Sequence, residues 1–171
     1  LIIDAQNEYL SGPLALSGMD AATANIARLL EAARKARRPV IHIRHLGTVG
    51  GMFDPQGERG AFIKGLEPQG DELIIEKRMP NAFNDTGLQK ALENLGSLDV
   101  IVCGFMSHSS VSTTVRAAKD YGLRCTLVSD ACATRDLPTA DGIISAEQVQ
   151  KTEMAIMNDN FATLTLTQNL I

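Results

Sequence analysis

Three polar positions in this sequence carry side chains that together could perform nucleophilic catalysis. Asp4 and Lys77 each follow a short apolar stretch, and a run of hydroxyl residues from Ser107 to Ser112 follows another. A hydroxyl or thiol needs a base to remove its proton, and a carboxylate held near a lysine is such a base. The lysine cation also offsets negative charge that develops in the transition state. If the fold brings the three positions together, they predict a site for nucleophilic attack.

Each of these residues also has a purely structural interpretation. Asp4 could cap the turn that follows it, and Lys77 could be a solvated charge. Ser109 or Ser110 could be a helix N-cap, which is the commonest role of serine at a helix start. His108 could be a loop histidine whose hydrogen bonds are satisfied locally. On the residue types alone, these alternatives stay open.

The elements that would position these residues alternate between strands and helices. Such alternation predicts a parallel sheet with helices on both faces. Right-handed crossovers then place the ends of the first, third and fourth strands at a common crevice. Strands are expected at Leu1–Ile3, Pro39–His45, Leu73–Glu76, Leu98–Cys103, Arg124–Ser129 and Ala162–Leu166, and helices at Asp20–Arg37, Thr86–Leu95, Ser109–Tyr121 and Ala146–Asn158.

Length and composition limit the class of protein. A chain of 171 residues with 44% hydrophobic and 21% charged residues is typical of one globular domain, which we expect to span residues 1–171. A net charge of −4 gives no reason to expect a nucleic-acid partner. No apolar run approaches the ~20 residues of a membrane span, so no membrane partner is expected. The basic residues between 34 and 38 are expected to form the solvated last turn of a helix.

The cysteines, the start of the chain and one long irregular segment carry further information. The three cysteines, Cys103, Cys125 and Cys132, show no metal-ligand spacing and predict buried thiols in a reducing, cytoplasmic setting. The chain begins abruptly in a strand, so we expect residues upstream of Leu1. The segment Leu46–Pro68 holds six glycines and two prolines, and so long an irregular stretch is usually functional.

Four segments of the chain resemble the isochorismatase-like hydrolase family of the cysteine hydrolase superfamily, in the family's usual order. They are Ile2–Asn7, Ile75–Lys77 with Asn81–Phe83, Gly104–Val111 with Thr114, and Asp130–Ala133. The resemblance implies a doubly wound, Rossmann-like, mostly parallel six-stranded α/β sheet in three α/β/α layers. It also implies a homo-oligomer, a dimer or tetramer, that hydrolyses C–N bonds of small amides.

The resemblance assigns a role to each residue of the site. Asp4 corresponds to the base of a Cys–Asp–Lys triad, Lys77 to the lysine, and Ser110 stands at the nucleophile position. The family also carries a non-proline cis peptide before the nucleophile, here Phe105–Met106, with the Met106 and Ser110 amides as the oxyanion hole. We expect His45, Phe83 and His108 to line the substrate pocket, and Gln6 to hydrogen-bond the substrate or to orient the catalytic groups.

The serine at position 110 departs from the family's usual cysteine. A serine hydroxyl is far less acidic than a thiol and needs a stronger base. Ser110 could be an engineered replacement of a cysteine, or a native nucleophile or native loss of activity. The enzyme could instead need no nucleophile, as in true isochorismatases, which hydrolyse a vinyl ether by acid catalysis. A catalytically inactive binding member of the family is a further alternative.

No metal or other cofactor is expected. Nicotinamidases of this family hold a metal with a D-x-H motif after the second strand, and the corresponding stretch Gly47–Asp54 lacks it. His42 and His45 are three apart on one strand and should point to opposite faces. The sequence therefore predicts a metal-free amide or ureide hydrolase that acts on a small molecule.

Overall fold

The computed structural model describes all 171 residues and is built around a six-stranded parallel sheet. The strand order is β3-β2-β1-β4-β5-β8, so the chain runs outward from β1 to β3 and then returns to β4 on the other side. Ligands of such doubly wound sheets bind where the order reverses, here beside β1 and β4. The predicted fold class is confirmed. The strands are β1 (Ile2–Ile3), β2 (Ile41–His45), β3 (Leu73–Lys77), β4 (Asp99–Phe105), β5 (Arg124–Ala133) and β8 (Ala162–Thr165).

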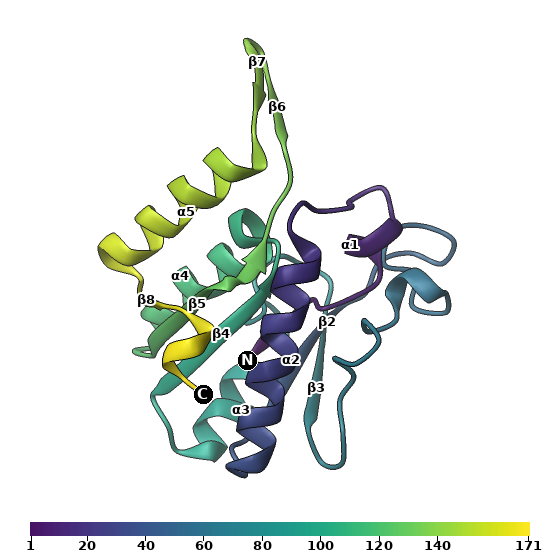
Figure 1. Cartoon of the computed structure of the whole chain (residues 1–171). Helices are drawn as coiled ribbons and strands as arrows, with labels where there is room; N and C mark the ends of the chain where they lie inside the picture. The colour runs from purple at the N-terminus through teal and green to yellow at the C-terminus, as the bar shows by residue number, and fades with distance from the viewer.

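Helices cover both faces of this sheet, which gives the three expected layers (Figure 1). One face packs against α2 (Met19–Lys35) and the short α1 (Glu8–Ser11), through a cluster of buried residues that includes Tyr9 and Ile26. The other face packs against α3 (Leu88–Leu95), α4 (Ser112–Asp120) and α5 (Ala146–Asn160). Both faces of the sheet are therefore covered, as the apolar strands predict, although Ile74 of β3 and Ile101 of β4 remain about half exposed.

Several elements differ from those expected. The predicted helix Ser109–Tyr121 is divided into a π-helical turn, Ser107–Val111, and α4. Strand β5 continues past its expected end to Ala133. The sequence did not predict α1, the 3-10 turns Glu58–Gly60 and Thr167–Asn169, or an antiparallel hairpin of β6 (Leu137–Thr139) and β7 (Gly142–Ile144) that projects from the body (Figure 1). The hairpin is too short and too exposed for its apolar residues to show strand periodicity.

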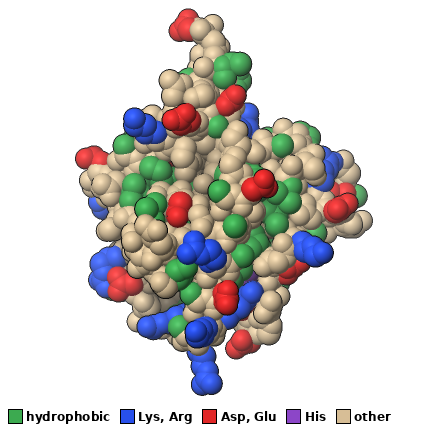
Figure 2. Space-filling model, viewed as in Figure 1, with side chains coloured by type: hydrophobic (Ala, Val, Ile, Leu, Met, Phe, Trp, Pro, Cys, Tyr) green, Lys and Arg blue, Asp and Glu red, His purple; other side chains and the backbone are tan.

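The face of the molecule that holds α2 carries no large field of one charge (Figure 2). On the face that holds α2, acidic and basic side chains are intermingled (Figure 2). In the predicted basic turn, Arg34 forms an ion pair with Glu72, with 2.7 Å between Arg34 Nε and Glu72 Oε1.

No helix combines the length and the apolarity that a bilayer crossing needs.

One glycine permits the close approach of the two central strands. Gly104 lies in β4 at φ +118°, at a register shift between β4 and β5. A Cβ atom there would lie 2.1 Å from the backbone oxygen of Ile3 and 2.6 Å from its nitrogen. Any side chain at position 104 must therefore push β1 away from β4, and with it the residue that follows β1, Asp4.

We expect Gly104→Ala to lower the free energy of unfolding by about 2 kcal/mol or more, because both the positive φ and the backbone clash oppose a Cβ. Gly87→Ala is the matched control, since a Cβ at Gly87 meets nothing within 4 Å. The control should lose less than about 1 kcal/mol. Urea denaturation measures both, and equal losses in the two variants would contradict the argument.

Candidate active site

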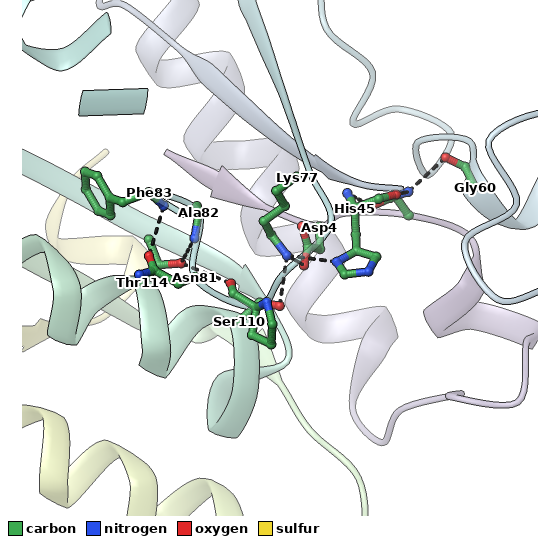
Figure 3. A network of polar contacts seen from close by, with 11 residues as sticks. Asp4, His45, Gly60, Lys77, Asn81, Ala82, Phe83, Ser110 and Thr114 are labelled. Atoms are coloured by element: carbon green, nitrogen blue, oxygen red, sulfur yellow. Dashed lines mark hydrogen bonds and ion pairs between the residues drawn. The ribbon is translucent and has the colours of Figure 1, made fainter. Parts of the chain in front are cut away.

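Lys77 is the last residue of β3, and its ammonium group makes three contacts with side chains from other elements (Figure 3). Its Nζ donates to Asp4 Oδ2 at 2.7 Å and to Ser110 Oγ at 3.1 Å, and lies 3.1 Å from His45 Nδ1. Lys77 is only 2% exposed, so the interpretation of a solvated charge is wrong. An ammonium has three N–H donors, and here each of them has an acceptor.

Asp4 follows β1 directly and is fully buried. Its backbone has φ +50°, a left-handed conformation that aspartate tolerates better than most residues, and its N–H donates to Ile43 O at 3.0 Å. One carboxylate oxygen receives Lys77, while the other, Oδ1, has no hydrogen-bond partner. The carboxylate therefore has a free acceptor beside the site.

Burial raises the pKa of Asp4 above that of an ordinary aspartate, and the charge and hydrogen bond of Lys77, with the nearby Ser110 hydroxyl, oppose this rise. The group is thus a stronger base than an exposed carboxylate, which is what proton removal from a hydroxyl requires.

Ser110 reaches Lys77 because the chain after β4 forms a wide turn. The Phe105–Met106 peptide bond is cis, and the Met106 carbonyl accepts the N–H groups of both Ser109 and Val111. No side-chain capping hydrogen bond is made at the start of the π turn or of α4, so the N-cap interpretation of the serines is wrong. The Met106 N–H donates to no group of the chain.

Side chains of α5 hold this turn from behind. Ser107 Oγ donates to Gln150 Oε1 at 2.6 Å, and Gln150 Nε2 donates to the Ser129 carbonyl at 3.2 Å. Ser112 Oγ donates to Glu153 at 2.5 Å. The sequence analysis missed Gln150 and Glu153, because no local pattern indicates that they contact residues about 40 positions earlier.

All the hydrogen bonds of the Gln6 side chain are made with backbone groups. Its Oε1 accepts the His45 N–H at 2.7 Å, and its Nε2 donates to the carbonyls of His45 and Gly60. Gln6 is fully buried, so it orients β2 and the following loop rather than offering a free group to a ligand.

Two residues expected in the pocket are engaged elsewhere. The Phe83 ring stacks on Tyr121 at 4.7 Å between centroids and points away from Lys77 in Figure 3. The N–H of the neighbouring Ala82 donates to Thr114 Oγ1 at 3.0 Å, and this hydrogen bond turns the segment Asn81–Phe83 toward the apolar core. His108 bonds through Nδ1 to Thr134 Oγ1, in keeping with a locally satisfied histidine. His108 makes no hydrogen bond to Asp4, Lys77 or Ser110.

A buried glutamate, also missed from the sequence, anchors the loop next to the site. Glu8 Oε2 accepts the Phe53 N–H at 3.0 Å and lies 3.7 Å from Arg59 Nη1. The Phe53 ring then packs against the His45 ring, with the centroids 4.8 Å apart. The expected functional segment Leu46–Pro68 is thus fixed to the site at Phe53.

The protein holds no group of three or more His, Cys, Asp or Glu side chains arranged to bind a metal ion. His42 and His45 lie apart as predicted, since His42 contacts Glu72 and His45 contacts Lys77. The three cysteines are buried and unpaired.

Comparison with known proteins agrees with this architecture. The family model of the isochorismatase domain matches residues 1–169. The chain belongs to the isochorismatase family of hydrolases. A crystal structure of an isochorismatase from Pseudomonas putida KT2440 superposes with a TM-score of 0.98 at 70% identity, covering 99% of this chain and 88% of that one. The predicted family is therefore confirmed.

Two curated relatives show the range of the family. An isochorismatase family protein of Bacillus subtilis strain 168, YddQ, is 38% identical over 98% of this chain and 95% of its own length. Nicotinamidase 3 of Arabidopsis thaliana is 30% identical over 78% of this chain and 72% of its own length.

We expect Lys77→Met to destabilise the fold by ~3–5 kcal/mol, because it leaves the buried Asp4 carboxylate without its cation. Without Lys77 the pKa of Asp4 rises further above 3.8, so ionisation opposes folding as the pH increases. The loss of stability measured by urea denaturation should therefore be larger at pH 8 than at pH 5.

The Lys77→Met/Asp4→Asn double variant is the control for this prediction, since it has no buried carboxyl to ionise. Its free energy of unfolding should change less between pH 5 and pH 8 than that of Lys77→Met. A Lys77→Met deficit that is independent of pH would contradict the role given to the ion pair.

Proposed function

We propose that the protein hydrolyses a C–N bond of a small amide or ureide through Asp4, Lys77 and Ser110. The observation that carries this proposal is the Lys77 ammonium bound to both Asp4 and Ser110, with Asp4 Oδ1 unpartnered beside them. This arrangement supplies a hydroxyl, a base and a fixed cation in one buried place, which is what nucleophilic catalysis requires. The relationship to a nicotinamidase supports an amide substrate.

In the first half-reaction, Ser110 Oγ forms a bond to the acyl carbon while its proton passes to Asp4 Oδ1. The carbonyl oxygen becomes an oxyanion, for which the Met106 and Ser110 N–H groups are the proposed donors. The Met106 N–H is free for that role. The C–N bond then breaks, and the proton on Asp4 passes to the leaving amine.

In the second half-reaction, water attacks the acyl group on Ser110. Asp4 takes a proton from this water and returns it to Ser110 Oγ as the ester bond breaks, which releases the carboxylic acid. Throughout, Lys77 holds the carboxylate in place through Oδ2 and leaves Oδ1 for the proton transfers. No cofactor enters these steps.

A second candidate is acid-catalysed hydrolysis of a vinyl ether without a covalent intermediate. The raised pKa of Asp4 favours this reaction too, because a carboxyl that keeps its proton can donate it to carbon. The two candidates differ in whether an acyl group is ever attached to residue 110.

We expect Asp4→Asn to lower hydrolysis of a turned-over amide or ureide by about 10²- to 10⁴-fold, because the general base is lost. Ser110→Cys should raise the rate, since a thiol ionises far more readily than a hydroxyl. Ammonia or amine release across a panel of small amides and ureides measures both. Asp20→Asn, an exposed aspartate on α2, is the matched control and should retain full activity.

The covalent step has its own test in the same samples. Mass spectrometry of the Ser110→Cys protein during turnover should reveal an acyl group on the peptide that contains residue 110. Undiminished turnover by Asp4→Asn, or turnover with no adduct in any variant, would reject the nucleophilic mechanism. Turnover of a vinyl ether in place of amides would support the second candidate.

Two sequence-based expectations about the protein's setting stay predictions. Self-association is supported by the projecting β6–β7 hairpin, on which Ile143 is 72% exposed. A reducing, cytoplasmic compartment is supported by the three unpaired cysteines.

A further inference from the structure

His45 has no role in the proposed triad, yet its ring is held from several directions. Lys77 Nζ lies 3.1 Å from Nδ1, and the Phe53 ring packs at 4.8 Å with an interplanar angle of 51°. The Gln6 side chain accepts a hydrogen bond from the His45 N–H and donates one to the His45 carbonyl. The register of β2 and β3 pairs His45 directly with Lys77. The ring orientation is therefore set by the fold.

The contact with Lys77 also decides which ring nitrogen carries the proton. An ammonium group has donors only, so Nδ1 must accept the third Lys77 N–H. A neutral ring that accepts at Nδ1 carries its hydrogen on Nε2. Burial, followed by the positive charges of Lys77 and Arg78, lowers the pKa of His45 to about 4, which keeps the ring neutral near pH 7.

The other ring nitrogen is free. Nε2 of His45 makes no hydrogen bond within the chain, and Figure 3 shows it turned away from Lys77. Ser110 Oγ and His45 Nδ1 bind the same ammonium nitrogen, so the free Nε2–H lies at the edge of the site that contains the nucleophile position.

We propose that His45 is a substrate-binding residue that offers a fixed, neutral Nε2–H donor to an oxygen of the substrate other than the oxygen of the scissile carbonyl. The proposal rests on the proposed function, because it takes the scissile carbonyl to lie at Ser110. It favours substrates with a second carbonyl near the scissile bond, such as acylureas, over simple amides. The cations Lys77 and Arg78 beside the ring disfavour a positively charged group there.

The first test concerns the ring itself and needs no substrate. In nitrogen NMR of protein labelled with ¹⁵N-histidine, the His45 ring should have a protonated Nε2 and an unprotonated Nδ1, unchanged from pH 8 to pH 5. His45→Gln identifies the signal by its loss, and His42 and His108 provide internal references. A His45 ring protonated on Nδ1, or one that titrates near 6.5, would overturn the proposal.

The second test measures binding in the Ser110→Ala background, so that no hydrolysis is required. Acetylurea and acetamide are the probes, titrated while the His45 Nε2–H signal is followed. We expect acetylurea to bind more tightly and to shift this signal, and acetamide to leave it in place. No binding of acetylurea, or equal shifts with both probes, would overturn the proposal.

Two substitutions in the same background separate the donor from the packing of the ring. His45→Phe keeps an aromatic ring and should weaken acetylurea binding about 5- to 10-fold, as expected for one lost hydrogen bond. His45→Gln keeps an N–H donor and should remain within about threefold of the parent. Equal affinity in all three proteins contradicts the proposal. A failure of hydrolysis in Ser110→Cys with these binding results intact would instead count against the proposed catalytic function alone.

Discussion

The Lys77 ammonium is the interaction on which the site depends. It is buried at the end of β3 and binds one group after β1, one on β2 and one on the π turn after β4. A buried cation is costly unless each of its donors is satisfied. A shift of β1 against β2 and β3 would take Asp4, the one anionic acceptor, away from this charge. The positions of Asp4, His45 and Ser110 and the register of the sheet are therefore coupled.

The surrounding polar groups act on backbone rather than on the reacting atoms. Gln6 fixes His45, Glu8 fixes Phe53, and Gln150 ties the turn at Ser107 to β5. All three reach across the fold, and Gln6 and Glu8 are fully buried. Their hydrogen bonds give the loop after β2 and the turn after β4 a single arrangement, which keeps His45 and Ser110 in place beside Lys77.

The sequence predicts the sheet and the meeting of Asp4, Lys77 and the serine turn, because parallel strand ends share one edge of the sheet. It does not predict the π turn, which arises when Met106 accepts two N–H groups. It does not predict that the Phe83 ring stacks on Tyr121, because residue type alone does not indicate this long-range partner. It also treats Gln6 as a possible ligand group, since hydrogen bonds to distant backbone leave no local pattern.

The properties of the site depend on which atoms of Asp4, His45 and Lys77 carry protons. Neutron diffraction from crystals exchanged into D₂O at pH 7 locates these protons most directly. We predict three deuterons on Lys77 Nζ, directed at Asp4 Oδ2, Ser110 Oγ and His45 Nδ1, with none on Asp4 and one on His45 Nε2. A deuteron on Asp4, or on His45 Nδ1, would contradict the account.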